Sequence, residues 1–126
     1  MKIIKTGIKG YREEIVTKDK TAKYYGSGLV EVFATPAMIA LMENTALHSI
    51  DILLQEGYSS VGIDISVKHL KATPLNAKVW CESIVTGVEG KKIFFSLKAY
   101  YDKGLIGEGT HTRYIINIKD FMNKLL

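Results

Sequence analysis

The sequence has little of what builds disulfides, multi-cysteine metal sites or membrane spans. Its 126 residues include a single cysteine, Cys81, which excludes an internal disulfide and the common zinc sites that use several cysteines. The longest apolar runs are far shorter than the roughly 20 residues that cross a bilayer. The first nine residues also lack the apolar core of a signal peptide. We therefore expect a reduced, cytoplasmic protein that does not insert into a membrane.

A strong charge of one sign is missing too. The chain has 17 Lys and Arg residues against 13 Asp and Glu residues, and this excess is spread along its length. No basic cluster with interleaved aromatic residues is present, so nucleic-acid binding is not expected. Phosphate-binding glycine loops and the His-Glu-x-x-His motif are also absent, and we expect no cofactor and no metal ion. The mild positive charge would suit an anionic small molecule.

The chain does contain enough apolar residues for one hydrophobic core. Hydrophobic residues make up 47% and charged residues 24%, and the length suits a single domain over residues 1–126. Residues 36–55 have the period of a helix, which would begin at Pro36 and end before Gly57. A short edge strand is predicted at 12–18, ahead of a loop with little regular structure.

After residue 60 the apolar period changes from that of a helix to that of a strand. Strands are predicted at 61–69, 78–86, 92–101 and 105–117, with a short C-terminal helix at 118–126. Short turns between the later strands imply antiparallel pairing. A sheet with one apolar face needs a cover, and the long helix can supply it. The sequence therefore predicts an α+β fold in which an antiparallel sheet wraps around one long central helix.

Glu43 is the residue in this helix that packing alone explains least. At about 3.6 residues per turn it lies on one stripe with apolar residues, namely Ile39, Ala40, Ala46, Leu47 and Ile50. A carboxylate among apolar side chains is costly unless it has a partner. This makes Glu43 a candidate functional residue. The alternatives are a structural buried carboxylate or a residue that faces a dimer partner.

His69 and Thr35 are candidates because of where their elements should lie. His69 continues the alternation of the strand at 61–69, so it should face the helix, as Glu43 should face the sheet; a β-bulge would break this inference. The alternative for His69 is a neutral histidine at the core edge, bonded to the backbone. Thr35 precedes Pro36, which is typical of a helix N-cap, and helix starts also expose N–H groups that can polarise a carbonyl.

Three other polar or reactive residues have simpler explanations. Cys81 has no activating neighbour in sequence and is predicted to be a small buried residue. His111 alternates with Gly109 and Arg113, and an exposed strand residue is the preferred interpretation. His48 lies on the polar stripe of the helix and should face solvent or an interface.

Three segments together resemble a known family. Residues 32–46 resemble the helix region of hotdog-fold thioesterases, in particular the fluoroacetyl-CoA thioesterase-like group. The blocks at 60–62 with 67–74, and at 107–113, resemble the same group, and the likeness extends over about residues 11–117. The resemblance implies a hotdog fold. It also implies a homodimer, or a higher oligomer, with acyl-CoA sites at the subunit interface.

The resemblance further implies hydrolysis of a small or medium acyl-CoA to a carboxylic acid and CoA. In order and spacing, the catalytic residues of the family match Thr35, Glu43 and His69, with Glu43 as general base or nucleophile. The alternatives are a non-catalytic acyl-CoA-binding hotdog module and a hotdog dehydratase or hydratase. The candidate substrate-binding residues are Gly62, Pro36 and Arg113.

Overall fold

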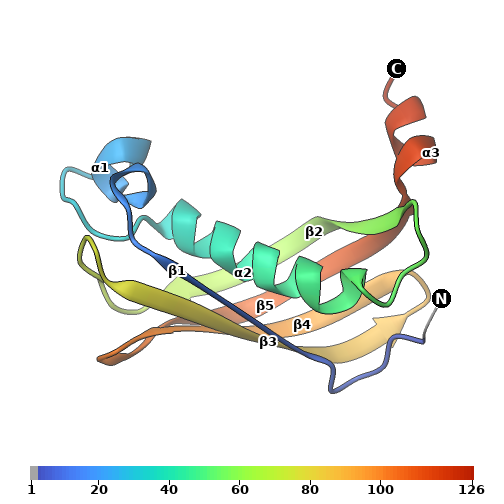
Figure 1. Ribbon diagram of the computed structural model, residues 1–126, viewed down its shortest axis with the longest axis horizontal. Coiled ribbons are helices and arrows are strands. Elements are labelled where there is room, and N and C mark those ends of the chain that lie inside the picture. Colours follow the sequence, from blue (N-terminus) through green and yellow to red (C-terminus); the bar gives the residue numbers. More distant parts are fainter. Residues whose placement is uncertain (1–2) are drawn as a thin grey trace.

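The computed structural model describes residues 3–126, in which an antiparallel sheet of five strands curls around one long helix (Figure 1). The predicted α+β architecture is confirmed. In chain order the elements are β1 (Lys9–Ile15), the 3-10 helix η1 (Lys18–Lys20), α1 (Ala22–Tyr25), α2 (Thr35–Asp51), β2 (Tyr58–His69), β3 (Lys78–Glu89), β4 (Lys92–Tyr101), β5 (Gly104–Asn117) and α3 (Ile118–Asn123).

The strand order in the sheet is β1-β3-β4-β5-β2. The strands β3, β4 and β5 pair with their sequence neighbours through short turns, as predicted, while β1 and β2 form the two edges. The helix α2 lies across the inner face of the sheet (Figure 1). Within residues 3–126, β5 is the only strand that pairs with β2, so the far side of this twelve-residue strand is an open edge.

The hydrophobic core lies between α2 and the middle of the sheet. Its fully buried large side chains include Met38 and Met42 from the helix and Phe95 from β4. Burying one such side chain stabilises the fold by about 1.5–3 kcal/mol. Cys81 is buried here as predicted, and this burial raises the pKa of its thiol to about 11. The thiol therefore stays protonated at neutral pH and is not a nucleophile.

The helix α2 differs from its prediction at both ends. It ends at Asp51, four residues before the predicted limit, and a turn follows it. Ala34 occupies the N-cap, Thr35 is already helical, and no side chain caps the helix start. The N-cap explanation for Thr35 is therefore wrong, because the residue lies one position too far along the chain. Its hydroxyl is available for another partner.

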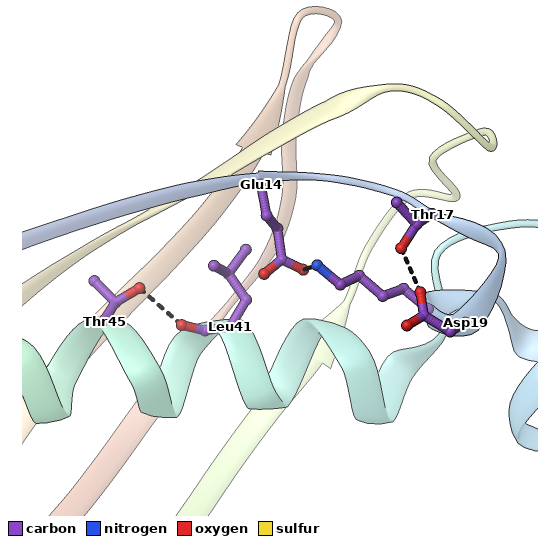
Figure 2. A network of polar contacts seen from close by, with 6 residues as sticks. Glu14, Thr17, Asp19, Leu41 and Thr45 are labelled. Carbon is purple, nitrogen blue, oxygen red and sulfur yellow. Dashed lines mark hydrogen bonds and ion pairs between the residues drawn. The ribbon is translucent and has the colours of Figure 1, made fainter.

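Polar contacts occur around the end of β1 and within the neighbouring helix α2 (Figure 2). Lys20 pairs with Glu14 of β1 at 3.2 Å, and Thr17 donates a hydrogen bond to Asp19 in the turn that follows the strand. Thr45 donates to the backbone oxygen of Leu41 at 2.7 Å, which satisfies a hydroxyl that is fully buried.

A β-bulge changes which residues of β2 face the helix. The pairing register with β5 shifts between Gly62 and Asp64, so Ile63 is the extra residue. Ser60 is buried before the bulge, whereas Ile65 and Val67 pack against the core after it. The predicted alternation through Ile63 is wrong, because one inserted residue exchanges the two faces, and Ile63 is 50% exposed. The prediction is correct for the part of β2 that ends at His69.

In the part of the chain described here, none of the helices has the length and apolar character needed to cross a membrane.

Candidate active site

The structure joins two of the three predicted catalytic residues directly. Thr35 begins α2 and His69 ends β2, and the distance from Oγ1 of Thr35 to Nδ1 of His69 is 2.8 Å. The other ring nitrogen of His69, Nε2, is buried and has no hydrogen-bond partner among residues 3–126. Burial lowers the pKa of His69, and the nearby backbone of Lys71 partly offsets this. The imidazole is therefore neutral at neutral pH and can accept a proton.

This pair lies in the wall of a cavity of about 490 Å³. The cavity is bounded by the segment that leads into α2 and by the residues that follow β2, including Phe33 and Lys71. Two residues of the same leading segment, Leu29 and Val30, are exposed. Pro36 is exposed in the first turn of α2 and is not among the residues that line this cavity.

Glu43 lies in a different part of the site. It follows Thr35 by eight residues on the same helix, which is a rise of about 12 Å at about 1.5 Å per residue. No hydrogen bond or ion pair joins Glu43 to Thr35 or His69 within the described residues. Within one chain, Glu43 therefore does not contact the Thr35–His69 pair.

The carboxylate of Glu43 instead approaches the bulge in β2. A Cβ atom placed on Gly62 would lie 2.9 Å from Oε2 of Glu43, so a side chain at this position would displace the carboxylate. Glu43 is half-buried on a flank of α2, beside Ile39 and Leu47, and the fully buried face of the helix is centred on Met38 and Met42. The sequence correctly predicted apolar neighbours for Glu43, but they lie on the side of the helix that is left partly open.

Arg113 and His111 lie behind Gly62 on β5. Arg113 is buried, and its guanidinium donates to the hydroxyl of Ser60 at 2.7 Å and to the backbone oxygen of Ser60 at 2.8 Å. Burial lowers the pKa of Arg113, while the negative charges of Glu43 and Asp51 oppose this shift. The arginine thus places a fixed positive charge close to Glu43.

The prediction that His111 is an exposed strand residue is wrong. Its side chain is 2% exposed, because it faces α2 on the same side of β5 as Arg113 and contacts the ring of Phe95 at 6.0 Å between centroids. No apolar residue lies on this face of β5 between Gly107 and Arg113, so the face resembled a solvated one. The burial of His111 was missed for this reason. The signal available was Gly107 on the same face of β5, where a Cβ atom would lie 2.5 Å from Sδ of Met38, so that the glycine leaves room for the helix.

Comparison with known proteins gives consistent results. A family model described as FlK, fluoroacetyl-CoA-specific thioesterase, matches residues 16–119. A curated relative, the fluoroacetyl-CoA thioesterase of Streptantibioticus cattleyicolor, is 35% identical over 95 residues, which cover 75% of this chain and 68% of the relative.

Solved structures are similar over nearly the whole chain. A crystal structure of a mutant of the fluoroacetyl-CoA-specific thioesterase FlK has a TM-score of 0.92 and 29% identity, and the match covers 99% of this chain and 97% of the other. A second crystal structure of that mutant, in complex with fluoroacetate and CoA, has a TM-score of 0.88 and 30% identity, with coverage of 94% and 99%. The hotdog fold predicted from the sequence is confirmed by these matches.

Proposed function

Because the chain belongs to the fluoroacetyl-CoA-specific thioesterase family, we propose that it hydrolyses the thioester of a small or medium acyl-CoA to a carboxylic acid and CoA. The observation that carries this proposal is the 2.8 Å contact between Thr35 and His69 in the wall of an open cavity. In our proposal the acyl-CoA enters this cavity, with Lys71 available to its phosphates. The cytoplasmic location and the single-domain organisation stay predictions.

Glu43 is proposed to promote attack on the thioester carbon. As a general base it removes a proton from water while a C–O bond forms and the C–S bond breaks; as a nucleophile it first forms a mixed anhydride, which water then hydrolyses. The neutral imidazole of His69 takes up the proton released from water and passes it to the CoA thiolate, and Thr35 holds the imidazole by its Nδ1 atom. Backbone N–H groups near Gly62 are proposed to stabilise the developing oxyanion.

These roles require Glu43 and His69 to meet, and we propose that a second copy of the chain brings them together. Four observations support a homodimer: the separation of the two groups along α2, the unpartnered Nε2 atom of His69, the open edge of β2, and the partly exposed apolar flank of α2 that carries Glu43. A polar atom that is buried without a partner is costly, so a partner from another chain would stabilise it.

The open edge of β2 suggests how the two copies are arranged. If two β2 strands pair antiparallel about a two-fold axis, the first half of one strand lies beside the second half of the other. An axis near Ile65 would place the Gly62 segment of one protomer next to the His69 end of its partner. Glu43 lies against Gly62, so it would then face the partner's cavity.

The function is tested by following free CoA released from a panel of acyl-CoAs that includes acetyl-, fluoroacetyl- and longer acyl groups. We expect wild-type turnover of at least one member and a loss of about 10³-fold or more in kcat for Glu43→Gln, which keeps the shape but removes the base. An alternative function would be required if wild type bound acyl-CoA without turning any of it over, or if Glu43→Gln kept the full rate.

The dimer is tested by molar mass in solution. Light scattering should give twice the chain mass for wild type. A charge on the open edge, as in Ile63→Lys, should shift the population toward monomer, since edge lysines oppose strand pairing. A monomeric wild type with full activity would contradict the two-copy site.

A further inference from the structure

His111 links the two sides of the bulge in β2. Its Nδ1 atom lies 2.8 Å from the backbone oxygen of Asp64, and its Nε2 atom lies 3.1 Å from Nη1 of Arg113. A carbonyl oxygen can only accept a hydrogen bond and a guanidinium can only donate one. The proton of the neutral ring is therefore on Nδ1, which donates to Asp64, while Nε2 accepts from Arg113.

Arg113 extends this chain of hydrogen bonds to the other side of the bulge. Its two contacts with Ser60, at 2.7 and 2.8 Å, hold both the hydroxyl and the backbone oxygen of that residue. The linked groups thus run from Asp64 through His111 and Arg113 to Ser60. They span the point between Gly62 and Asp64 where the regular pairing of β2 and β5 is interrupted. A buried network with its partners satisfied makes the segment rigid.

The network also touches Glu43. A Cβ atom on Gly62 would lie 2.9 Å from Oε2 of Glu43 and 3.0 Å from Cε1 of His111, so the carboxylate and the imidazole pack against the same backbone atom. Any movement of the bulge would change the distance between Gly62 and Glu43. A shift of about 1 Å in a reacting group can lower a rate by about 100-fold.

We propose that His111 is a positioning residue for the proposed hydrolysis: through Asp64 and Arg113 it fixes the Gly62 bulge against Glu43. This inference rests on the proposed function for its catalytic consequence, while the holding of the bulge is independent of it. His111 does not need to contact the substrate in this role.

Burial is the main cause of the lowered pKa of His111, and the positive charge of Arg113 on β5 adds to it. The hydrogen bond to the backbone of Asp64 and the negative charges of Glu43 on α2 and Asp64 on β2 oppose this shift. A protonated ring would direct a second N–H group at the guanidinium and lose the bond from Arg113. Protonation of His111 therefore breaks the link between the ring and Arg113, while the link to the backbone of Asp64 stays.

Two substitutions separate positioning from packing. His111→Phe fills the ring volume but has no hydrogen bond, whereas His111→Asn keeps an amide N–H near the position of Nδ1. Thr112→Val is the matched control, because Thr112 is adjacent to His111 on β5 and strand alternation directs its side chain to the other face of the sheet. Each variant is measured for kcat and KM on an acyl-CoA that wild type hydrolyses, and for amide hydrogen exchange in residues 60–66.

For His111→Phe we expect kcat to fall by about 10- to 100-fold, KM to change by less than about threefold, and exchange in residues 60–66 to become faster. His111→Asn should recover part of both losses, and Thr112→Val should match wild type. The ratio of wild-type kcat to that of His111→Phe should fall toward one as the pH is lowered through the pKa of His111.

Wild-type kcat in His111→Phe, or equal losses in His111→Phe and His111→Asn, would overturn the proposal. If His111→Phe does not fold, His111→Asn decides the matter against wild type: unchanged kcat and unchanged exchange both contradict the role of the ring. If wild type hydrolyses no acyl-CoA, the proposed function fails. The exchange measurement then still decides whether His111 holds the bulge.

Discussion

The two parts of the candidate site are built in different ways. The Thr35–His69 pair consists of one hydrogen bond beside an open cavity, and it leaves the Nε2 atom of His69 without a partner in residues 3–126. The part around Glu43 rests on a buried network in which the Arg113 guanidinium and both nitrogens of His111 are bonded. The chain thus fixes the second part by itself, whereas the first part leaves a position for a group that the single chain does not supply.

The substitution Gly62→Ala should disrupt the part around Glu43, and we expect it to have the largest effect on activity. The new methyl group would lie 2.9 Å from Oε2 of Glu43, and the flexible carboxylate would have to turn away. We expect kcat to fall by about 100-fold or more with a change in stability below about 1 kcal/mol. Steady-state kinetics and thermal unfolding measure the two effects.

Gly109→Ala is the control for this prediction. A methyl group there would lie 2.1 Å from the backbone oxygen of Ser66, which cannot turn away, so this variant should lose stability by about 1–3 kcal/mol or more. If Gly62→Ala instead lost stability like Gly109→Ala and kept its kcat per folded molecule, the close approach of Glu43 would have no catalytic meaning.

Mixing two inactive variants tests whether the two parts belong to different chains. Suppose that each active site takes Glu43 from one chain and His69 from the other. A hybrid dimer of Glu43→Gln and His69→Ala then has one site with both substitutions and one site with neither. Random mixing should then restore about a quarter of wild-type activity. A site contained in one chain would always carry one change, so no recovery would occur. Each variant mixed with itself is the control.

Thr35→Val should weaken the first part moderately. It removes the hydroxyl that holds Nδ1 of His69 and keeps the shape of the side chain. Loss of one such hydrogen bond corresponds to about a 3- to 10-fold decrease in kcat. Thr35→Ser keeps the hydroxyl and should retain most of the activity. Equal activity in Thr35→Val and wild type would show that the contact does not contribute.

The pH dependence of stability is the smallest expected effect and compares both parts at once. Burial lowers the pKa of His69 and of His111 below their usual value of 6.5. The unfolded chain therefore binds more protons than the folded chain once the pH falls below about 7. The free energy of unfolding should decrease as the pH is lowered from 7 to 5. Urea unfolding at several pH values measures it.

A variant that lacks the imidazole of His111 isolates the contribution of this residue to the pH dependence of stability. His111→Asn should show a shallower decrease over the same pH range than wild type, because one of the two histidines no longer titrates. An equally steep decrease would assign the effect to His69 or to other groups.

The order of elements could be predicted from the sequence because it depends on local patterns. The change from a helical to a strand period after residue 60, and the turn residues between the later strands, predicted one long helix followed by four strands, which the structure confirms within residues 3–126. The end of α2 was predicted four residues too late, since Ile52 and Leu53 continue an apolar pattern in a turn. Local pattern does not mark where packing stops a helix.

The candidate site was predicted in part, for a related reason. Residue type, spacing and family resemblance identified Thr35, Glu43 and His69 as candidates. None of these signals predicted the direct contact between Thr35 and His69. The bulge at Ile63 and the burial of His111 were missed, because both depend on the register between β2 and β5. Register is a relation between two segments about 50 residues apart, and no local pattern records it.

The sequence by itself determined the fold class, the family and the side chains available for chemistry, since periodicity and residue type are properties of short segments. The tertiary structure alone decided which of those side chains meet. It placed His69 on Thr35, set Glu43 against Gly62 about two helical turns away, and buried His111 on the face of the sheet that is covered by α2. The physical reason is that hydrogen bonds and charges act over a few ångströms, so their partners are set by packing between distant segments.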